Sequence, residues 1–296
     1  MRIRIPASTS NLGSAFDAAG LALQLYLRLE IIPCAGAESH LEYRGPDERL
    51  VPNDESNLIW RTMRLAAERA GKVLPAFSMI VDNEIPIAKG LGSSAAATLA
   101  GIAAADHLCR LELDRKQWLT MATEIEGHPD NAAAALWGGL VFSIGNEEIY
   151  ASRCEFPHRW TIVAVTPDFE LETKVARSVL PAHVPHRDAV FNVQRAAFLA
   201  AQLARGQGDG LREAMTDRLH QPYRSPLIPG LEEILSMEDC QGLLGIALSG
   251  AGPTVAAIAD SREQEIGARV QAVFRKHGLS SQVRLLRADH TGVTPY

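Results

Sequence analysis

Apolar and polar positions along the chain alternate with the periods of strands and helices. Residues 2–5 and 26–32 alternate or run apolar as strands do, and a loop rich in Ser, Asn and Gly separates them. Residues 57–70 carry apolar side chains at helical spacing, and Gly71 is suited to end that helix. The same reasoning predicts a strand at 77–81, then an alanine-rich helix after a glycine-rich turn, helices at 116–126 and 131–136, and a strand at 140–144.

A second block of elements begins after Trp160. It comprises strands at 161–166, 246–248, 254–258 and 282–287, and helices at 192–205, 211–218 and 266–277. Residues 154–159 include Pro157 and few apolar side chains, which is typical of a linker. We therefore predict two domains, residues 1–155 and 156–296. Because strands and helices mix without strict alternation, we expect an α+β fold.

Composition and charge exclude several classes of protein. The 296 residues are 47% apolar and 22% charged, as in an ordinary globular chain. The formal charge of -6 gives no basic field, so neither nucleic acid nor a membrane is expected as a partner. The four cysteines are widely spread without a CxxC pair, and the N-terminus lacks an apolar signal core. We expect a cytoplasmic protein with free thiols.

The sharpest local signal is PIAKGLGSSAAA at residues 86–97. It predicts a helix N-terminus behind a flexible turn, where free N–H groups and the helix dipole suit a di- or triphosphate. Gly90 and Gly92 allow the backbone to approach a ligand closely. Ser93 can cap the helix, and Ser94 can offer an oxygen to a metal ion. Taken alone, the segment fits an ordinary strand–helix turn equally well, and it is not a Walker A loop because no lysine follows the second glycine.

Three further segments accompany this turn: PASTSNLGSAFD at 6–17, EGHPDN at 126–131 and LSGAGPT at 248–254. In their order and spacing they resemble the GHMP kinase superfamily, and the resemblance runs from residue 5 to about residue 258. EGHPDN followed by two glycines narrows the resemblance to the homoserine kinases of that superfamily. The resemblance implies an N-terminal domain of the ribosomal-protein-S5-like domain 2 fold and a ferredoxin-like C-terminal domain. It also implies ATP-dependent phosphorylation of the L-homoserine hydroxyl to O-phospho-L-homoserine, a step of threonine biosynthesis.

The resemblance also assigns a nucleotide site. ATP is expected at the glycine-rich turn, and Mg²⁺ between the oxygens of Ser94 and Glu126, a hard pair that suits this ion. The adenine base is expected near Asn57. The ATP-binding residues implied in this way are Asn57, Pro86, Ile87, Ala88, Lys89, Gly90, Leu91, Gly92, Ser93, Ser94, Ala95 and Ala96.

Substrate-binding residues are implied in both halves of the chain. The ammonium and hydroxyl groups of homoserine need acceptors, and a planar guanidinium fork suits its carboxylate. The resemblance implies, as substrate-binding residues, Asn11, Asp17, His128, Asn131, Arg177 and Arg224, and, as catalytic residues, Asn11, Asp17, Thr173 and Arg177. Thr173 stands where related mevalonate and galactose kinases carry an aspartate, so the γ-phosphate itself is expected to assist deprotonation, with Asp17 as the reserve base.

Departures from the family pattern leave alternatives open. Ser14 and Ala15 replace the usual Pro-Gly pair, and this change can alter the φ preference of the loop.

Two other functions fit the same motifs. One is that of a GHMP enzyme of the mevalonate-pathway or shikimate type, and the other is that of a catalytically silent nucleotide-binding protein on the same fold. The presence of Ser94, Glu126 and Asn11 argues against a silent protein. A homodimer is the expected default assembly.

Overall fold

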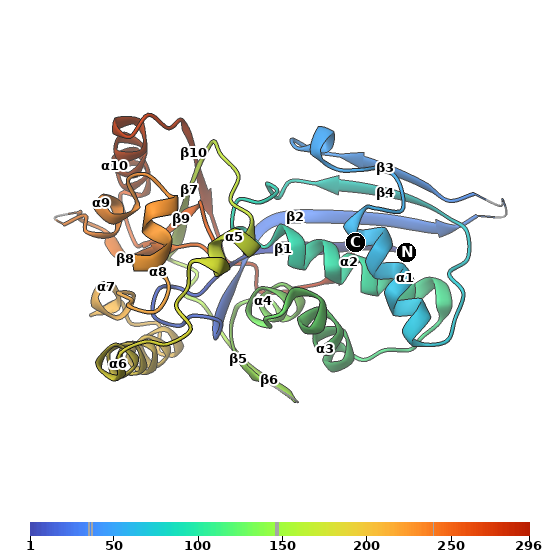
Figure 1. Cartoon of the computed structure of the whole chain (residues 1–296), viewed down its shortest axis with the longest axis horizontal. Coiled ribbons are helices and arrows are strands. Elements are labelled where there is room, and N and C mark those ends of the chain that lie inside the picture. The colour runs from blue at the N-terminus through green and yellow to red at the C-terminus, as the bar shows by residue number, and fades with distance from the viewer. Residues whose placement is uncertain (35, 37, 146–147, 239) are drawn as a thin grey trace.

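Two β-sheets with helices packed against them make up the fold (Figure 1). The computed structural model describes residues 1–34, 36, 38–145, 148–238 and 240–296. Within these residues the first sheet has seven strands in the order β11-β1-β2-β4-β3, with β5 paired to β2 and β6 paired to β5. Its strands are β1 (Arg2–Ser10), β2 (Ala19–Pro33), β3 (His40–Arg44), β4 (Phe77–Asn83), β5 (Leu140–Gly145), β6 (Ile149–Cys154) and β11 (Thr294–Pro295).

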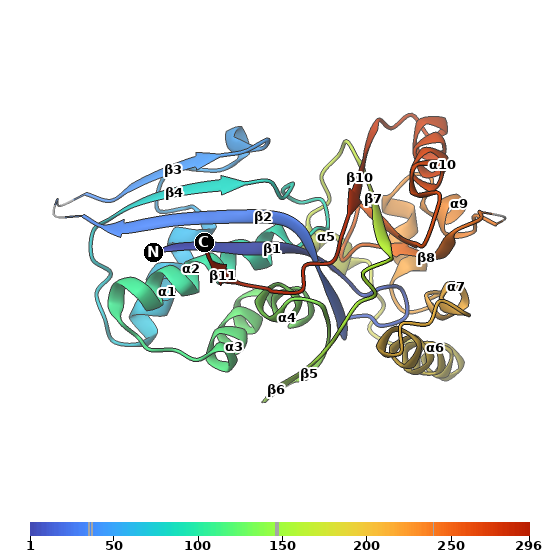
Figure 2. The ribbon, with the colours of Figure 1, turned by 180° about the vertical axis from the view of Figure 1, so that it is seen from behind.

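Helix α2 (Ser93–Cys109) lies in the centre of a helical layer on one side of this sheet (Figures 1 and 2). Its neighbours in the layer are α1 (Leu58–Arg69), α3 (Arg115–Glu126) and α4 (Asp130–Trp137). Small side chains let α1 approach closely, since a Cβ on Gly101 would lie 2.6 Å from the Cβ of Thr62. Because α2 is buried along most of its length, the core fixes the position of its N-terminus.

Helix α3 has strong signals at both ends. Asp114 accepts a hydrogen bond from the Gln117 backbone N–H at 2.8 Å, and the Gln117 side chain accepts one from the Asp114 N–H at 2.8 Å, which completes a capping box. Gly127 ends the helix in the left-handed region, at φ +84°. Glu126 is therefore held at the last helical residue, directly before the turn into α4.

The second sheet, over the residues that are described, has four antiparallel strands in the order β10-β7-β9-β8. With helices between β7 and β8 and between β9 and β10, this is the β-α-β-β-α-β arrangement of a ferredoxin-like domain. The predicted α+β class is confirmed. The elements of this half are β7 (Thr161–Pro167), α5 (Thr173–Ser178), α6 (His186–Ala204), α7 (Leu211–Ala214), α8 (Gln221–Arg224), α9 (Leu231–Leu235), β8 (Leu243–Leu248), β9 (Val255–Ala259), α10 (Glu263–Lys276) and β10 (Ser281–Leu286), with a 3-10 turn at Ser225–Leu227. A 3-10 turn at Glu48–Leu50 lies in the first half, between β3 and α1.

The end of the chain returns to the first sheet. Strand β11 pairs antiparallel with β1, with Pro295 opposite Ile3, so the two termini lie near each other (Figure 2). Ala288 also bridges to Leu23 of β2. The division at residue 155 stays a prediction, and the segment after it contributes one strand to the sheet of the segment before it.

Several predicted bounds were wrong. The predicted strand at 2–5 continues to Ser10, and the one at 26–32 begins at Ala19, so both enter the segment that was expected to be a loop. Strand β6 was missed because it is short, lies at a sheet edge, is mostly exposed and shows no alternation of apolar and polar residues.

The helix predicted at 211–218 ends at Ala214 instead. The carboxylate of Asp217 accepts hydrogen bonds from the N–H groups of Leu219, His220 and Gln221, and this turn starts α8. Side-chain hydrogen bonds of this kind compete with a continuing helix. The helix predicted at 192–205 begins earlier, at His186. The prediction missed its first turns because they are largely exposed and carry little apolar pattern.

Candidate active site

A cavity brings together segments that are far apart in the sequence. It is lined by the N-terminal loop, the glycine-rich turn, the EGHPDN segment, α5 and the start of the last glycine motif. The lining residues are Ser10, Asn11, Asp17, Ala88, Lys89, Gly90, Gly92, Ser93, Ser94, Ala95, Glu126, His128, Asp130, Asn131, Thr173, Arg177, Arg224, Gly250 and Ala251.

The glycine-rich turn leads directly into the N-terminus of α2. Gly92 is the N-cap at φ +72°, and Gly90 and Ala88 also have positive φ values of +77° and +52°. A Cβ on Gly92 would lie 2.2 Å from Ser8 Oγ, and one on Gly90 would lie 2.3 Å from the Ser249 carbonyl oxygen. Both glycines are therefore required for close packing of the turn against its neighbours, as well as for its backbone conformation.

The segment at 248–254 braces this turn from the other half of the chain. Ser249 Oγ lies 2.6 Å from the Gly90 carbonyl oxygen and 2.8 Å from Thr9 Oγ1. The backbone N–H of Thr254 donates to the carbonyl of Lys89 at 3.2 Å. The turn is thus held on both sides before any ligand enters, which is the preorganisation that phosphate binding at a helix N-terminus needs.

A second, more apolar cavity adjoins the first, and Ala88, Ser93, Ser94 and Thr173 line both. Side chains such as Tyr43, Val51, Ile59 and Ile87 form its walls. An apolar cavity beside a phosphate-binding turn has the character of a site for a flat aromatic base.

Three oxygen-bearing side chains meet at the edge of the turn. Ser94 Oγ donates to Glu126 Oε1 at 2.8 Å, and Thr98 Oγ1 donates to the same oxygen at 2.6 Å. A carboxylate with hydroxyl oxygens beside it is a hard donor set. The group fits Mg²⁺ next to a bound polyphosphate.

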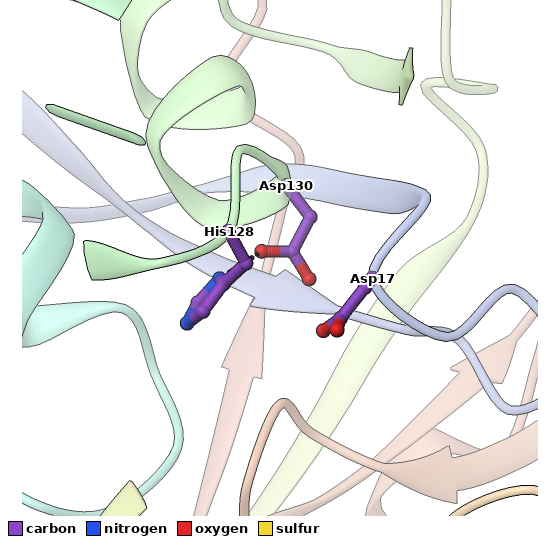
Figure 3. Close-up of side chains that lie close together, drawn as sticks. All are labelled: Asp17, His128 and Asp130. Carbon is purple, nitrogen blue, oxygen red and sulfur yellow. Dashed lines mark hydrogen bonds and ion pairs between the residues drawn. The ribbon is translucent and has the colours of Figure 1, made fainter. Parts of the chain in front are cut away.

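Asp17, His128 and Asp130 converge in the same cavity (Figure 3). His128 Nδ1–H donates to Asp130 Oδ1 at 2.6 Å, so its Nε2 faces away from that carboxylate. Burial disfavours the imidazolium, but the hydrogen bond and charge of Asp130 outweigh it and raise the pKa of His128. Burial likewise opposes ionisation of Asp130, but hydrogen bonds from His128, Asn131 and Ser10 and the charge of His128 lower its pKa.

The ligand atoms of these three residues lie within 4.8 Å of one another, close enough to surround a cation. Both oxygens of Asp17 already accept hydrogen bonds from Arg177, at 2.7 and 3.1 Å. An ammonium group can add its own N–H donors to these carboxylates, because each carboxylate oxygen accepts more than one hydrogen bond. The geometry therefore suits an organic ammonium group.

Arg224 lies at the base of the cavity and is 1% exposed. Its Nε donates to the carbonyl of Ala176 at 3.1 Å, and its Nη1 to the carbonyl of Gly250 at 3.0 Å. Burial lowers its pKa to about 10, and the nearby charge of Arg177 acts in the same direction. Within the described part of the chain, no carboxylate forms an ion pair with Arg224 and no hydrogen bond involves its Nη2. A buried cation without a direct counter-ion is suited to an anionic ligand.

Comparison with known proteins decides the family. Residues 57–139 match the family described as GHMP kinases N terminal domain, and residues 199–276 match GHMP kinases C terminal. The homoserine kinase of Deinococcus radiodurans is 42% identical over 98% of this chain and 95% of its own length. The chain belongs to the homoserine kinase family of GHMP kinases. The homoserine kinase of Aquifex aeolicus is 39% identical over 100% of this chain and 99% of its own length.

Solved structures agree with this membership. The crystal structure of homoserine kinase from Cytophaga hutchinsonii superimposes with a TM-score of 0.88 at 26% identity, covering 100% of this chain and 97% of its own. A mevalonate kinase structure aligns with a TM-score of 0.70 at 16% identity, over 98% of this chain and 99% of its own, and so shares the fold. The predicted family and the predicted two-part GHMP fold are confirmed.

The structure brings most of the residues that the sequence assigned to the site into the two cavities. All the assigned substrate, catalytic and metal residues line the first cavity, and Asn57 and Ile87 line the second. Leu91 and Ala96 do not face either cavity, because their side chains are buried in the core. Pro86 lines a third cavity beside them.

Two assigned amides have bonding partners within the protein. Asn11 accepts from the Asp17 N–H at 2.9 Å and donates to the Gly250 carbonyl at 2.9 Å. Asn131 accepts from Ser8 Oγ and donates to Ser10 Oγ, both at 2.9 Å. These bonds shape the loops around the cavity, and direct contact of either amide with a substrate stays a prediction.

The replaced Pro-Gly pair fits the loop without strain. Ala15 is buried and does not adopt a positive φ, whereas Asn11, Leu12 and Gly13 before it do. Ser14 Oγ donates to the carbonyl of Ala214 at 2.7 Å and so ties the loop to α7. The expected change of φ preference has no consequence for this conformation.

Sequence reasoning missed Asp130, Thr98 and Phe16 as contributors to the site. Asp130 stood within EGHPDN, and its position two residues after His128 was a signal that could have been used. Thr98 lies one helical turn after Ser94, on the same face of α2. Phe16 gave no signal, because its proximity to Arg177 and Arg224 depends on tertiary packing.

Proposed function

We propose that this protein transfers the γ-phosphoryl group of ATP to the hydroxyl group of L-homoserine, yielding ADP and O-phospho-L-homoserine. The observation that carries the proposal is the shared cavity. A helix N-terminus suited to phosphate and a buried guanidinium without a carboxylate partner line the same space. The homoserine kinases named above support the choice of substrate.

The polyphosphate lies at the turn before α2 in this proposal, with the adenine in the apolar cavity beside it. Backbone N–H groups at the start of α2 and the helix dipole orient and partly neutralise the phosphates. Ser94 and Glu126 would hold Mg²⁺, with Thr98 fixing the carboxylate. When bound there, the ion supplies positive charge to the β- and γ-phosphates.

Homoserine lies between the two halves. Its carboxylate faces Arg224 and the free edge of Arg177, and its ammonium group faces Asp17 and the His128–Asp130 pair. Held at both charged groups, the substrate presents its hydroxyl toward the turn, which supplies the proximity that phosphoryl transfer requires. Thr173 lines both cavities and provides a hydroxyl where they meet. The hydroxyl proton passes to the γ-phosphate, and Asp17 is the reserve acceptor.

The proposal also covers the assembly of the protein and its location in the cell. Over the residues described, no helix is both long and apolar enough to cross a membrane. We propose a cytoplasmic enzyme of threonine biosynthesis that forms a homodimer and has neither nucleic acid nor a membrane as partner. No observation favours the mevalonate-pathway, shikimate or silent alternatives over homoserine.

A substrate panel tests the proposal. With Mg-ATP present, we expect ADP release with L-homoserine and none above background with mevalonate or shikimate. With 3-amino-1-propanol, which is homoserine without its carboxylate, kcat/KM should fall about a hundredfold or more because the buried guanidinium stays unpaired. Coupled ADP detection gives the rates, and ³¹P NMR identifies the phosphate ester. Equal kcat/KM values for homoserine and 3-amino-1-propanol would contradict homoserine as the substrate, while the assignment of kinase activity would remain.

Replacing Glu126 with glutamine tests the metal assignment. Glutamine keeps the volume and an oxygen that can accept from Ser94 and Thr98, but it removes the negative charge. We expect kcat to fall about tenfold or more at limiting Mg²⁺, with partial recovery at higher Mg²⁺ and an unfolding temperature near that of the wild type. The matched control is Glu124→Gln on the exposed side of the same helix, which should leave kcat unchanged. If Glu126→Gln turned over like the wild type at limiting Mg²⁺, Glu126 would not be a ligand of the metal ion.

A further inference from the structure

His220 is a fully buried histidine beneath the cavity, and the proposed chemistry does not use it directly. It is the N-cap residue of α8, and its side chain has no exposed surface. Its Nδ1 lies 3.2 Å from Nη1 of Arg224, and its Nε2 lies 2.9 Å from the carbonyl oxygen of Gly13. The ring therefore connects the N-terminal loop with the arginine at the base of the cavity.

These two contacts select one form of the imidazole. A guanidinium can only donate hydrogen bonds, so Nδ1 must be the acceptor, and a carbonyl can only accept, so Nε2 must carry the proton. Both requirements are met by the neutral Nε2–H tautomer. Burial lowers the pKa of His220 and so favours a neutral ring, and the charge of Arg224 acts in the same direction against that of Asp217.

Among the residues that the structure describes, the groups around the ring leave no competing partner for Nδ1. Asp217 Oδ2 lies 3.6 Å from Nε2, and it accepts hydrogen bonds from the backbone N–H groups of His220 and Gln221. Phe16 stacks on the imidazole with ring centroids 4.9 Å apart and planes at 19°. The same Phe16 ring lies 5.3 Å from the guanidinium carbon of Arg224. The N-terminal loop thus accepts the hydrogen bond of the imidazole through Gly13, and places Phe16 against both the imidazole and the guanidinium.

We infer that His220 is a positioning residue for substrate recognition, which holds Arg224 so that Nη2 faces the carboxylate of homoserine. This inference rests on the proposed function. Nε and Nη1 of Arg224 are bonded to Ala176, Gly250 and His220, so the rotation of the guanidinium plane is fixed and only its remaining edge serves the ligand. Without the acceptor at Nδ1, the guanidinium has one fewer contact to fix it and carries one unpaired buried N–H.

Three substitutions separate positioning from simple core packing. His220→Asn places an amide oxygen where Nδ1 stands and keeps an acceptor for Arg224, but loses the contact with Gly13. His220→Gln keeps a donor toward Gly13 and loses the acceptor. His220→Phe keeps an aromatic ring for stacking and loses both contacts. Each variant is assayed for KM of homoserine, KM of ATP, kcat and the midpoint of thermal unfolding.

We expect KM for homoserine to rise about tenfold or more in His220→Gln and His220→Phe, because both lose one hydrogen bond to a charged group. In His220→Asn, which keeps this bond, KM should stay within about threefold of wild type. KM for ATP should stay near wild type in all three. The inference is overturned if a folded His220→Phe variant binds homoserine as the wild type does. It is also overturned if KM follows the loss of unfolding temperature in all three variants alike.

A measurement on the unchanged protein covers the case in which the variants do not fold. The ¹⁵N chemical shifts of the His220 ring report which nitrogen carries the proton, and we expect Nε2–H with an unprotonated Nδ1. An Nδ1–H tautomer or a doubly protonated ring overturns the inference. A wild-type enzyme inactive on homoserine would instead contradict the proposed function, whatever the tautomer of His220 is.

Discussion

Replacing Ser93 with glutamate is expected to abolish binding of Mg-ATP while the chain stays folded. Ser93 is the first residue of α2 and lines both cavities, so its side chain stands where the phosphates and the base are proposed to meet. A carboxylate at a helix N-terminus interacts favourably with the helix dipole, which preserves the fold. The same carboxylate repels the polyphosphate, and like charges placed together cost several kcal/mol, so affinity should fall about a hundredfold or more.

Ser93→Gln is the matched control, because it has nearly the same shape without the charge. Calorimetric titration with Mg-ATP should show a much smaller loss for this variant, and circular dichroism should show similar unfolding midpoints for both. Nucleotide affinity near wild type in a folded Ser93→Glu variant would mean that the turn before α2 does not bind the phosphates.

The position chosen for this test depends on the structure. A substitution at Gly92 would be a poorer test, because a Cβ there points at Ser8 Oγ, 2.2 Å away, and the residue has φ +72°. A valine there would disturb the packing of the turn against β1, and a loss of ATP binding would then not distinguish a blocked site from a damaged fold.

Ordered motifs predicted which segments would meet, because each motif is explained by a shared ligand. Ser94 and Glu126 are 32 positions apart and lie 2.8 Å apart through their side-chain oxygens, as the assignment of both to one metal ion requires. Arg177 and Arg224, in the second half, line the same cavity as Asp17 in the first. The resemblance of these motifs to those of the GHMP kinases therefore assigned the residues to one site without knowledge of the path of the chain between them.

The direction in which a polar side chain points could not be predicted in this way. Asn11 and Asn131 offer the acceptors that an ammonium or a hydroxyl group needs, yet both amides bond to the protein itself. A motif does not distinguish an amide that contacts a ligand from one that holds the loop around it. The contacts of Phe16 and His220 were also out of reach, since stacking between residues so far apart in sequence is decided by packing alone.

The largest effect on the substrate is expected from replacing Arg224 with lysine. An ammonium group cannot reproduce the fork of the guanidinium, and Nε and Nη1 of Arg224 are already bonded to the Ala176 and Gly250 carbonyls. A lysine could satisfy one of these contacts and would leave the substrate carboxylate poorly paired. For a desolvated charge pair this costs about 2–5 kcal/mol, which is roughly 30-fold to several thousandfold in kcat/KM for homoserine.

Two comparisons give that result a definite meaning. Mg-ATP affinity of Arg224→Lys should stay near wild type, because Arg224 does not line the apolar cavity proposed for the base, and retained affinity also shows that the variant is folded. Arg218→Lys is the matched control: Arg218 lies nearby in sequence, is 46% exposed and pairs with Asp188, so its replacement should leave kcat/KM unchanged. If Arg224→Lys kept kcat/KM within about threefold of wild type, a difference below 1 kcal/mol, the carboxylate would be recognised elsewhere. Because ATP binding is measured separately, that outcome would leave the assignment of the phosphate-binding turn intact. The free edge of Arg177 would then be the next candidate for binding the substrate carboxylate.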